Sequence, residues 1–357
     1  MIMLLKELIM DDILILHNTF GPADDPLYQS RAAVMDQVDM VEQSCEKLGI
    51  EFTTLPVESL MHLISLLEVR REKIIFNLIE EFLDSLAQAA FVPVICQAYG
   101  KSCTGNSTPT SVLAQNKVQA KAVLTAEGLE CPAGAVFHNG KYKANLLKKG
   151  NYIIKPAFCD GSEGITADSV VQLPAETAKA KALVAQLYRQ FGHPVIVERF
   201  IGSRELNISL MERNGKVDVL PIAEIDFSAF SDNQPNIVDY SAKWEKESFV
   251  YNNTPRKIPA DLSENLYSRI EKLSIAAWHT IGCRDYARVE FRLDEDEKPY
   301  IIEVNPNPDI SIEAGFAAAL EAAGIPYEMF IFAILDNANE RLKGFSNANK
   351  YSKSSRR

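Results

Sequence analysis

In the first hundred residues, short apolar runs alternate with a segment whose apolar side chains recur at helical spacing. Residues 13–16 are all apolar, which is typical of a buried strand. Residues 28–48 carry apolar side chains on one helical face and stop at Gly49, which predicts a helix. Residues 74–78 and 91–95 are predicted to form two further strands. Strands that alternate with helices predict a parallel sheet covered on both faces.

The pattern changes after a linker at 100–110 that is rich in Gly, Ser, Thr and Pro. From residue 195 the sequence is rich in strands, and a hairpin is predicted at 286–293 and 299–304 around a polar turn. The other predicted strands are 152–156, 195–197, 206–210 and 217–220, and the predicted helices are 111–127, 175–191, 261–281, 312–323 and 326–342. The chain is therefore predicted to join a parallel α/β part to a larger mixed (α+β) part.

Length and composition indicate an ordinary globular protein of two or three domains, with 357 residues, 47% hydrophobic and 24% charged. The net charge is −11 and no predicted element carries a basic stripe, so nucleic acid is not an expected partner. The one basic run lies at the end of the chain, where residues 346–357 are expected to form a flexible basic tail.

Cysteine usage and hydropathy favour a cytoplasmic protein. The six cysteines form no C-x-x-C pair, which argues against both a disulfide framework and a zinc ribbon. The apolar start carries acids and lacks a basic leader, so a signal peptide is not expected. No apolar stretch reaches ~18 residues, so no membrane partner is expected either.

The predicted hairpin carries acidic side chains on both strands. Glu290 lies on the first strand and Glu303 on the second, and antiparallel pairing around a short turn places them side by side on one face. Two like charges at that separation repel unless a cation lies between them. Asn305 points to the same face and adds a neutral oxygen, which completes the kind of ligand set that Mg²⁺ prefers. The alternative is a solvated sheet face with paired acids.

Lys155 closes an apolar strand just before a loop that contains Gly161 and Gly164. Glycine allows a backbone to approach phosphate closely, and successive N–H groups can hold the anion. A glycine-containing surface turn is the alternative. The sequence contains neither a complete P-loop, because Ile95 stands where its first glycine is needed, nor a G-x-G-x-x-G after a strand.

The apolar strand at 195–197 runs into a short connector with an acid at each end, Glu198 and Glu205. Backbone groups of such a connector can pair with an adenine edge, and an acid can accept hydrogen bonds from ribose hydroxyls. An edge strand followed by a polar turn would have the same pattern.

In their order and spacing, these pieces resemble the ATP-grasp enzymes, and within them the D-alanine–D-alanine ligase family, from about residue 12 to 335. Residues 287–294 and 303–308 are close to the family's most distinctive stretch. Residues 76–80 resemble its F-N-L-x-E/H-G segment, with Glu81 in place of the glycine. Lys117 and Lys121 resemble the two lysines of its D-K-x-x-x-K helix, and 152–165 resembles its second lysine and phosphate loop.

The resemblance implies an α/β (α+β) ATP-grasp fold with an N-terminal parallel α/β (pre-ATP-grasp) domain. The implied divisions are an N-terminal substrate-side domain at 1–105, a central ATP-grasp subdomain with the phosphate loop at 106–195, and a C-terminal subdomain with the metal and catalytic residues at 196–345. The loop around 228–250 is expected to close over the nucleotide.

Individual roles also follow from the resemblance. It implies ATP contacts from Lys117, Lys155, Glu198, Phe200, Ile201, Glu205 and Lys243, metal ligands at Glu290, Glu303 and Asn305, and catalytic contacts from Arg288, Ser162 and Asp25. The implied cofactors are ATP and two Mg²⁺ ions, for which Mn²⁺ can substitute. The implied reaction joins a carboxylate to an amine through an acyl phosphate, with small amino-acid or peptide substrates and the homodimer common in the family. Arg288 would hold the developing oxyanion.

The amino-acid pocket departs from the family pattern. Asp25 replaces a glutamate, and Trp244 replaces a tyrosine after Lys243. Asp309 and Ala314 stand where the family has glycine and a serine that binds the second substrate's carboxylate. These changes predict an altered substrate.

Two other functions fit the same residues. One is a nucleotide-binding regulatory or partner-binding protein without ligase activity, which has no need of an oxyanion arginine at position 288. The other is an ATP-dependent carboxylase or kinase on the same fold, which differs in its acceptor.

Overall fold

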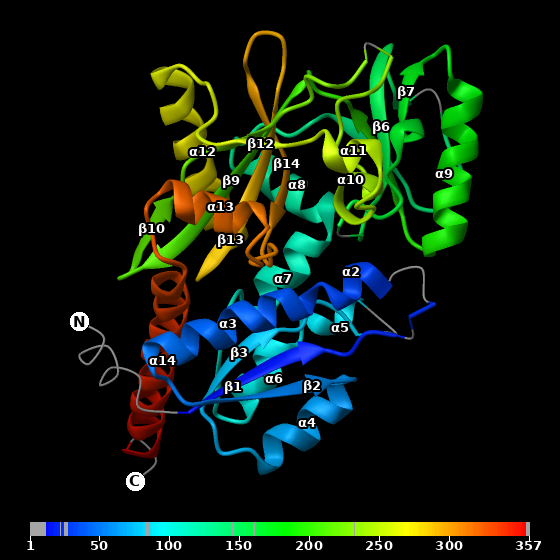
Figure 1. Cartoon of the computed structure of the whole chain (residues 1–357). Coiled ribbons are helices and arrows are strands. Elements are labelled where there is room, and N and C mark those ends of the chain that lie inside the picture. Colours follow the sequence, from blue (N-terminus) through cyan, green and yellow to red (C-terminus); the bar gives the residue numbers. More distant parts are fainter. Residues whose placement is uncertain are drawn as a thin grey trace.

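The N-terminal part of the computed structural model is a parallel sheet of four strands in the order β2-β1-β3-β4 (Figure 1). The structure describes residues 12–21, 23–24, 28–82, 86–143, 146–159, 161–231 and 233–354, without the side chains of 29, 30, 86 and 345–354. The strands are β1 (Ile13–Asn18), β2 (Phe52–Val57), β3 (Ile74–Leu78) and β4 (Ser102–Cys103). The expected parallel sheet is confirmed.

Helices cover both faces of this sheet, and the alternation along β1 explains why. Ile13 and Ile15 face α3 (Val34–Leu48), whereas Leu14 and Leu16 face a second core that contains residues of α4 (Leu60–Val69) and α6 (Val92–Ala98). A parallel strand that is buried on both faces is apolar at every position, as this one is. The short helices α2 (Tyr28–Ala32) and α5 (Leu86–Ala89) complete this part.

The strand predicted at 91–95 is wrong, because these residues enter α6. Pro93 lies in the first turn of that helix, where its missing N–H is not needed, and Val92 and Cys96 are buried on one helical face. The fourth strand is formed instead by the short β4. An apolar run of five residues fits a strand and a buried helix equally well, so hydrophobic periodicity could not distinguish the two structures here.

The helix predicted at 111–127 is divided in two. Asn116 ends α7 (Thr108–Gln115) and caps α8 (Lys117–Ala126), because its side chain accepts a hydrogen bond of 3.2 Å from the backbone N–H of Gln119. A side chain that accepts from the first turn begins a new helix. The break places Lys117 in the first turn of α8.

A second, antiparallel sheet has the order β5-β8-β6-β7 and packs against α9 (Thr177–Phe191). Its strands are β5 (Gly134–Phe137), β6 (Gly150–Pro156), β7 (Val170–Leu173) and β8 (Val195–Arg199), with a 3-10 turn at Ala167–Ser169. The predicted strands at 152–156 and 195–197 and the helix at 175–191 are confirmed.

The third sheet has the order β12-β11-β9-β13-β14, with β10 paired to β9. Its strands are β9 (Arg204–Arg213), β10 (Lys216–Val219), β11 (Ala223–Ile225), β12 (Arg256–Lys257), β13 (Tyr286–Leu293) and β14 (Pro299–Asn305). One face packs its apolar side chains on α8 and α12 (Glu264–Ile281). The other face is polar and carries the candidate site.

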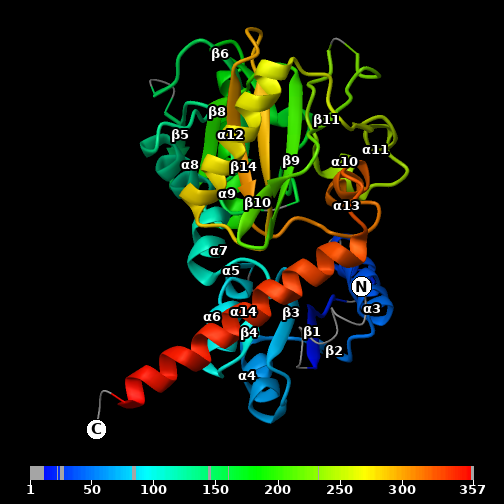
Figure 2. The same ribbon diagram turned by 90° about the vertical axis from the view of Figure 1, so that its left-hand side faces the viewer.

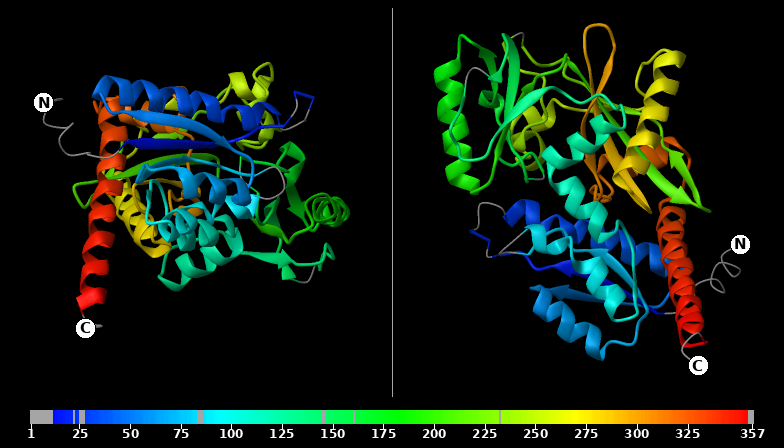
Figure 3. Two further views of the ribbon diagram at one scale, coloured as in Figure 1. Left: turned by 90° about the horizontal axis from the view of Figure 1, so that it is seen from below. Right: turned by 180° about the vertical axis from the view of Figure 1, so that it is seen from behind.

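The last two helices are α13 (Gly315–Ala322) and α14 (Tyr327–Ser354), and α14 returns to the N-terminal sheet. Phe330, Ile334 and Leu335 join the same core as Ile13 and Phe76. Figure 2 shows α14 crossing the N-terminal part, and Figure 3 shows that part below the other two sheets in its right-hand view. Residues 346–354 continue α14, and the flexibility expected of the tail at 346–357 stays a prediction.

In the described part of the chain, no single helix has the length and apolar character needed to cross a membrane. A bent pair at 315–322 and 327–344, with an angle of 106°, passes that test by length and composition only.

Candidate active site

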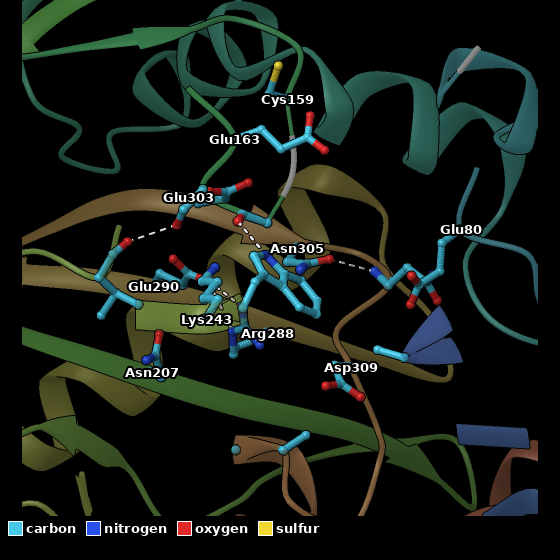
Figure 4. Close-up of a pocket in the computed structure, with 18 of the residues that line it drawn as sticks. Glu80, Cys159, Glu163, Asn207, Lys243, Arg288, Glu290, Glu303, Asn305 and Asp309 are labelled. Carbon is cyan, nitrogen blue, oxygen red and sulfur yellow. Dashed lines mark hydrogen bonds and ion pairs between the residues drawn. The ribbon is translucent and has the colours of Figure 1, made fainter. Parts of the chain in front are cut away.

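The polar face of the third sheet brings together residues from three strands. Glu290 on β13 lies opposite Glu303 on β14 and opposite Asn207 on β9. Directly opposed residues of antiparallel strands share a face, so the predicted side-by-side placement of the two glutamates is confirmed. Figure 4 shows Glu290, Glu303 and Asn305 around one space.

Asn207 is a site residue that the sequence analysis missed. Its Oδ1 atom is buried and has no hydrogen-bond partner among the described residues. A buried polar atom without a partner is costly, so its presence beside two carboxylates needs an explanation. The available signal was strand alternation, because Asn207 lies two residues after Glu205.

The donor set fits Mg²⁺ better than a metal held by protein alone. The described residues contain no group of three His, Cys, Asp or Glu side chains arranged for a metal ion. The site instead offers the carboxylates of Glu290 and Glu303 and the unpaired amide oxygen of Asn207. The Oδ1 atom of Asn305 accepts a hydrogen bond of 2.8 Å from the backbone N–H of Asn307, which fixes its direction. Mg²⁺ commonly takes one or two carboxylates and completes its shell with substrate phosphates and water.

Lysines surround Glu303. The Nζ atom of Lys117 lies 3.0 Å from Oε1 of Glu303, and the same ammonium donates to the carbonyl of Cys159. Burial alone would raise the pKa of Glu303, but Lys117 and Lys155, with a smaller effect from Lys243, lower that pKa to about 2. Glu303 is therefore ionised at neutral pH, as a metal ligand must be.

A second buried carboxylate, Glu198 on β8, is shared by two lysines. Lys155 Nζ lies 2.9 Å from Oε1, and Lys121 from α8 donates to Oε2. Burial works to raise the pKa of Glu198, yet the two ammonium groups outweigh it, so the pKa is lowered. Burial also lowers the pKa of Lys121 to about 8. Lys121 does not line the cavity, and its link to Lys155 through Glu198 was not predicted.

Arg292 on β13 holds the connector that follows β8. Its guanidinium donates to the carbonyls of Ile201 and Gly202 at 2.7 and 2.8 Å, and it lies 4.5 Å from the ring centre of Phe200. It also pairs with Glu205 at 2.9 Å. Burial raises the pKa of Glu205 despite this cation. The connector predicted to face adenine is thus fixed by Arg292, to which the sequence analysis assigned no role.

Arg288 is oriented by a neighbour on its own strand. Its Nε and Nη2 atoms donate to Oε1 of Glu290 at 3.0 and 2.7 Å. Burial would lower the pKa of Arg288, but Glu290, Glu303 and Asp309 raise it. The guanidinium is a permanent cation beside the predicted metal ligands.

The phosphate loop and the loop at 228–250 are joined by hydrogen bonds. Ser162, in the left-handed backbone region with φ 64°, donates to the carbonyl of Val238 at 2.8 Å. The indole N–H of Trp244 donates to the carbonyl of Gly161 at 3.1 Å. Trp244 lies at the end of α10 (Tyr240–Trp244), which is followed by α11 (Phe249–Asn252). The two loops therefore cover one side of the site together.

Most of these residues, though not Lys121, line one cavity of about 1570 Å³ between the three sheets. The cavity is lined by every predicted site residue that the structure describes, namely Lys117, Lys155, Ser162, Glu198, Phe200, Ile201, Glu205, Lys243, Arg288, Glu290, Glu303 and Asn305. Asp25 lies outside the described residues. The altered positions Trp244, Asp309 and Ala314 line the same cavity.

Comparisons of sequence and of structure both find D-alanine–D-alanine ligases among the proteins that this chain resembles. The family model described as D-ala D-ala ligase C-terminus matches residues 138–336. The D-alanine–D-alanine ligase of Bordetella avium is 28% identical over 69% of this chain and 73% of its own. An uncharacterized protein of Sinorhizobium fredii, y4sG, is 27% identical over 77% of each chain.

Among solved structures, the D-alanine–D-alanine ligase of Bacillus anthracis complexed with ATP superimposes with a TM-score of 0.70. That match covers 94% of this chain and 99% of the other at 18% identity. The ligase of Coxiella burnetii gives 0.69 over 97% of this chain and all of its own, at 14% identity.

Proposed function

The chain belongs to the D-alanine–D-alanine ligase family, and we propose that it is an ATP- and Mg²⁺-dependent ligase that joins an amino-acid or peptide carboxylate to an amine. The ATP-grasp fold expected from the sequence is confirmed by the structural neighbours. The observation that carries the proposed activity is the set of Glu290, Glu303 and Asn207 oxygens beside Arg288 in one cavity.

The nucleotide would lie between the second and third sheets. The solved Bacillus anthracis ligase of similar fold is a complex with ATP, which supports a nucleotide in this cavity. Adenine would lie against the connector at 200–202, which Arg292 fixes, and Glu205 would accept from ribose. Lys117 and Lys155 would hold the phosphates, with the glycine loop and Lys243 above them.

Glu290, Glu303 and Asn305, with Asn207, would hold Mg²⁺. When bound there, Mg²⁺ would offset the charge that develops on the phosphates. The chain's own part in phosphoryl transfer is then mainly positioning and electrostatics. Lys117 pairs with Glu303 in this structure and is also proposed to contact a phosphate, so nucleotide entry would alter the present ion pair.

Arg288 would stabilise the oxyanion of the tetrahedral intermediate formed when the amine attacks the acyl phosphate. A guanidinium offers planar donors and keeps its charge through the reaction. The two hydrogen bonds to Glu290 fix it before substrate arrives, so little reorganisation is needed. Ser162 and Trp244 would act by tying the phosphate loop to the loop at 228–250 over the reacting groups.

The substrate is proposed to differ from D-alanine. Trp244, Asp309 and Ala314 line the cavity at positions that depart from the family pattern, while the phosphate and metal residues are retained. Within the proposed division of the chain at 105, 195 and 345, the N-terminal domain would supply the wall around Glu80. The homodimer stays a prediction.

The test is phosphate release from Mg-ATP by the purified protein, screened with single and paired D- and L-amino acids, with products identified by mass. Release that depends on a pair and yields the dipeptide supports the ligase. ATP binding without release under any pair would contradict it and favour a binding protein. Release that yields D-alanyl-D-alanine would overturn the altered substrate alone.

A further inference from the structure

Arg256 on the edge strand β12 is carried onto the site face by the pairing of the third sheet. It lies opposite Ile225 on β11, Ala223 two residues earlier lies opposite Asn207 on β9, and Asn207 lies opposite Glu290. Opposed residues share a face, and so do residues two apart on a strand. The Arg256 side chain therefore lies on the same face as the predicted metal ligands. It lines the cavity and is exposed to it.

A single hydrogen bond to the described residues holds the guanidinium of Arg256. Its Nη1 donates to the carbonyl of Glu313 at 3.0 Å. Its Nε lies close to Gly315, since a Cβ atom added to that glycine would come within 3.2 Å of it. Arginine has five N–H donors, and over the described residues this carbonyl is the one acceptor that the structure assigns to it. The neighbouring Ala314 has no side-chain donor. Donors that are fixed in direction but unused can receive a planar acceptor.

The electrostatics around Arg256 favour an added anion. None of the described carboxylates lies within 4.0 Å of its nitrogen atoms, whereas the nearby Arg288 already pairs with Glu290. The surrounding protein and the Arg288 cation lower the pKa of Arg256, while Asp309 offsets part of that effect. A carboxylate between the protein and Arg256 would relieve the repulsion between the two cations.

We propose that Arg256 binds the free carboxylate of the amine substrate, so that the acceptor is an amino acid or peptide with an unblocked carboxyl end. This rests on the proposed ligase function. A guanidinium pairs with a carboxylate through two parallel N–H···O bonds, which also fixes the direction of the amine. Arg256 would offset the repulsion that Asp309 exerts on such a carboxylate. Arg256 would thus determine specificity, a role distinct from that proposed for Arg288, which is to stabilise the oxyanion.

A labelling experiment tests binding without any turnover. Phenylglyoxal modifies exposed arginines. The full chain would be labelled in the presence of Mg-ADP, and peptide mass mapping would give the rate at which Arg256 is modified. Arg71, whose side chain is 88% exposed and outside the cavity, is the internal control. The probes are the common amino acids in both D and L forms, each compared with its amide. At least one free acid should slow labelling of Arg256 threefold or more, while its amide does not and Arg71 is unaffected.

Equal protection by an acid and its amide, or protection by none of the acids, would overturn the proposal for Arg256. This outcome can be told apart from failure of the ligase function, because the labelling does not require product. A protein that releases no phosphate yet shows acid-specific protection keeps the carboxylate site and loses the ligase.

Kinetics of variants give the second test, with the amine substrate that the phosphate-release screen identifies. Arg256→Ala should raise the KM for that amine roughly 10- to 100-fold while the KM for ATP changes less than twofold. Arg256→Lys should recover only part of the loss, because it lacks the two-pronged geometry. Arg213→Ala, on β9 and outside the cavity, should match wild type. An unchanged amine KM in Arg256→Ala would refute the assignment.

Discussion

Lys117 and Glu303 form an ion pair of 3.0 Å, which joins a residue proposed to hold phosphate to one proposed to hold metal. The lysine comes from the first turn of α8 and the glutamate from β14. The ammonium contacts Oε1 of Glu303, an oxygen of a carboxylate that is proposed to hold Mg²⁺. The pair neutralises the buried ammonium of Lys117 and the partly buried carboxylate of Glu303 before nucleotide enters, since either charge alone would be costly there.

Glu303→Gln should reduce Mg-ATP turnover by more than about 100-fold without unfolding the protein, because a neutral amide cannot balance the metal charge. Phosphate release and the thermal unfolding midpoint are the measurements. Glu295→Gln, in the exposed turn of the same hairpin, is the matched control and should behave as wild type. Near-normal turnover in Glu303→Gln would refute the metal assignment.

Arg288→Ala should leave ATP affinity within about threefold of wild type and lower product formation by about 100-fold or more. The reason is that the guanidinium is proposed to meet charge that develops only during amine attack. ATP binding by calorimetry and product by mass separate the two effects. Loss of ATP binding in this variant would show that Arg288 has been given the wrong role.

Lys121→Met should destabilise the fold by roughly 3 kcal/mol at pH 7, because it removes one of two cations that neutralise buried Glu198. Lys155 would then be bound more tightly to Glu198, so ATP affinity should also fall.

The pH dependence of the Lys121→Met variant gives a further check. The pKa of Glu198 is lowered in the fold, so its contribution is present above its ordinary value of 4.5 and is lost as pH falls through the lowered value. The stability gap between wild type and Lys121→Met should therefore narrow below about pH 4.5. A gap that is constant between pH 7 and pH 3 in denaturant titrations would contradict the shared ion pair.

Arg292→Ala should cost roughly 3–5 kcal/mol of unfolding free energy, because it leaves Glu205 buried without its cation and frees the carbonyls of Ile201 and Gly202. Arg292→Ala should also lower the affinity for ATP. Arg292→Lys keeps the charge but cannot reach all of these acceptors, so it should recover only part of the stability and leave the affinity for ATP low. Urea unfolding and ATP calorimetry give the two readouts. If Arg292→Lys binds ATP as wild type does, the connector does not depend on this geometry.

ATP should protect the loop at 228–250 from proteolysis, because that loop is already tied to the phosphate loop by Trp244 and Ser162. Trp244→Phe removes only the indole N–H, so protection should need several-fold more ATP, in keeping with one hydrogen bond of about 1 kcal/mol. Phe249→Leu, exposed in the same loop and outside the cavity, is the control. Absence of protection in the wild type would argue against a lid.

The sequence by itself determined the features that rest on local pattern. Long helical periods predicted α3, α9 and α12, and the polar turn after residue 293 predicted the hairpin that carries Glu290 and Glu303. The direct pairing of the two glutamates also needs the register shift between Glu290 and Phe291, which the structure shows. The residues that bear charge in the cavity stood in recognisable short segments, because phosphate and metal contacts require particular side chains at fixed spacing.

Tertiary structure alone decided what depends on pairing between distant segments. The pattern of residues 91–95 fits a strand or a helix, and packing beside β4 favours the helix. The position of α14 depends on the N-terminal sheet, because its apolar side chains share the core of that sheet. Asn207 and Arg256 acquire their places from the order β12-β11-β9-β13, which no local pattern encodes. Strand alternation fixes which residues share a face, but only the assembled sheet brings those faces together, because its hydrogen bonds join segments far apart in the chain.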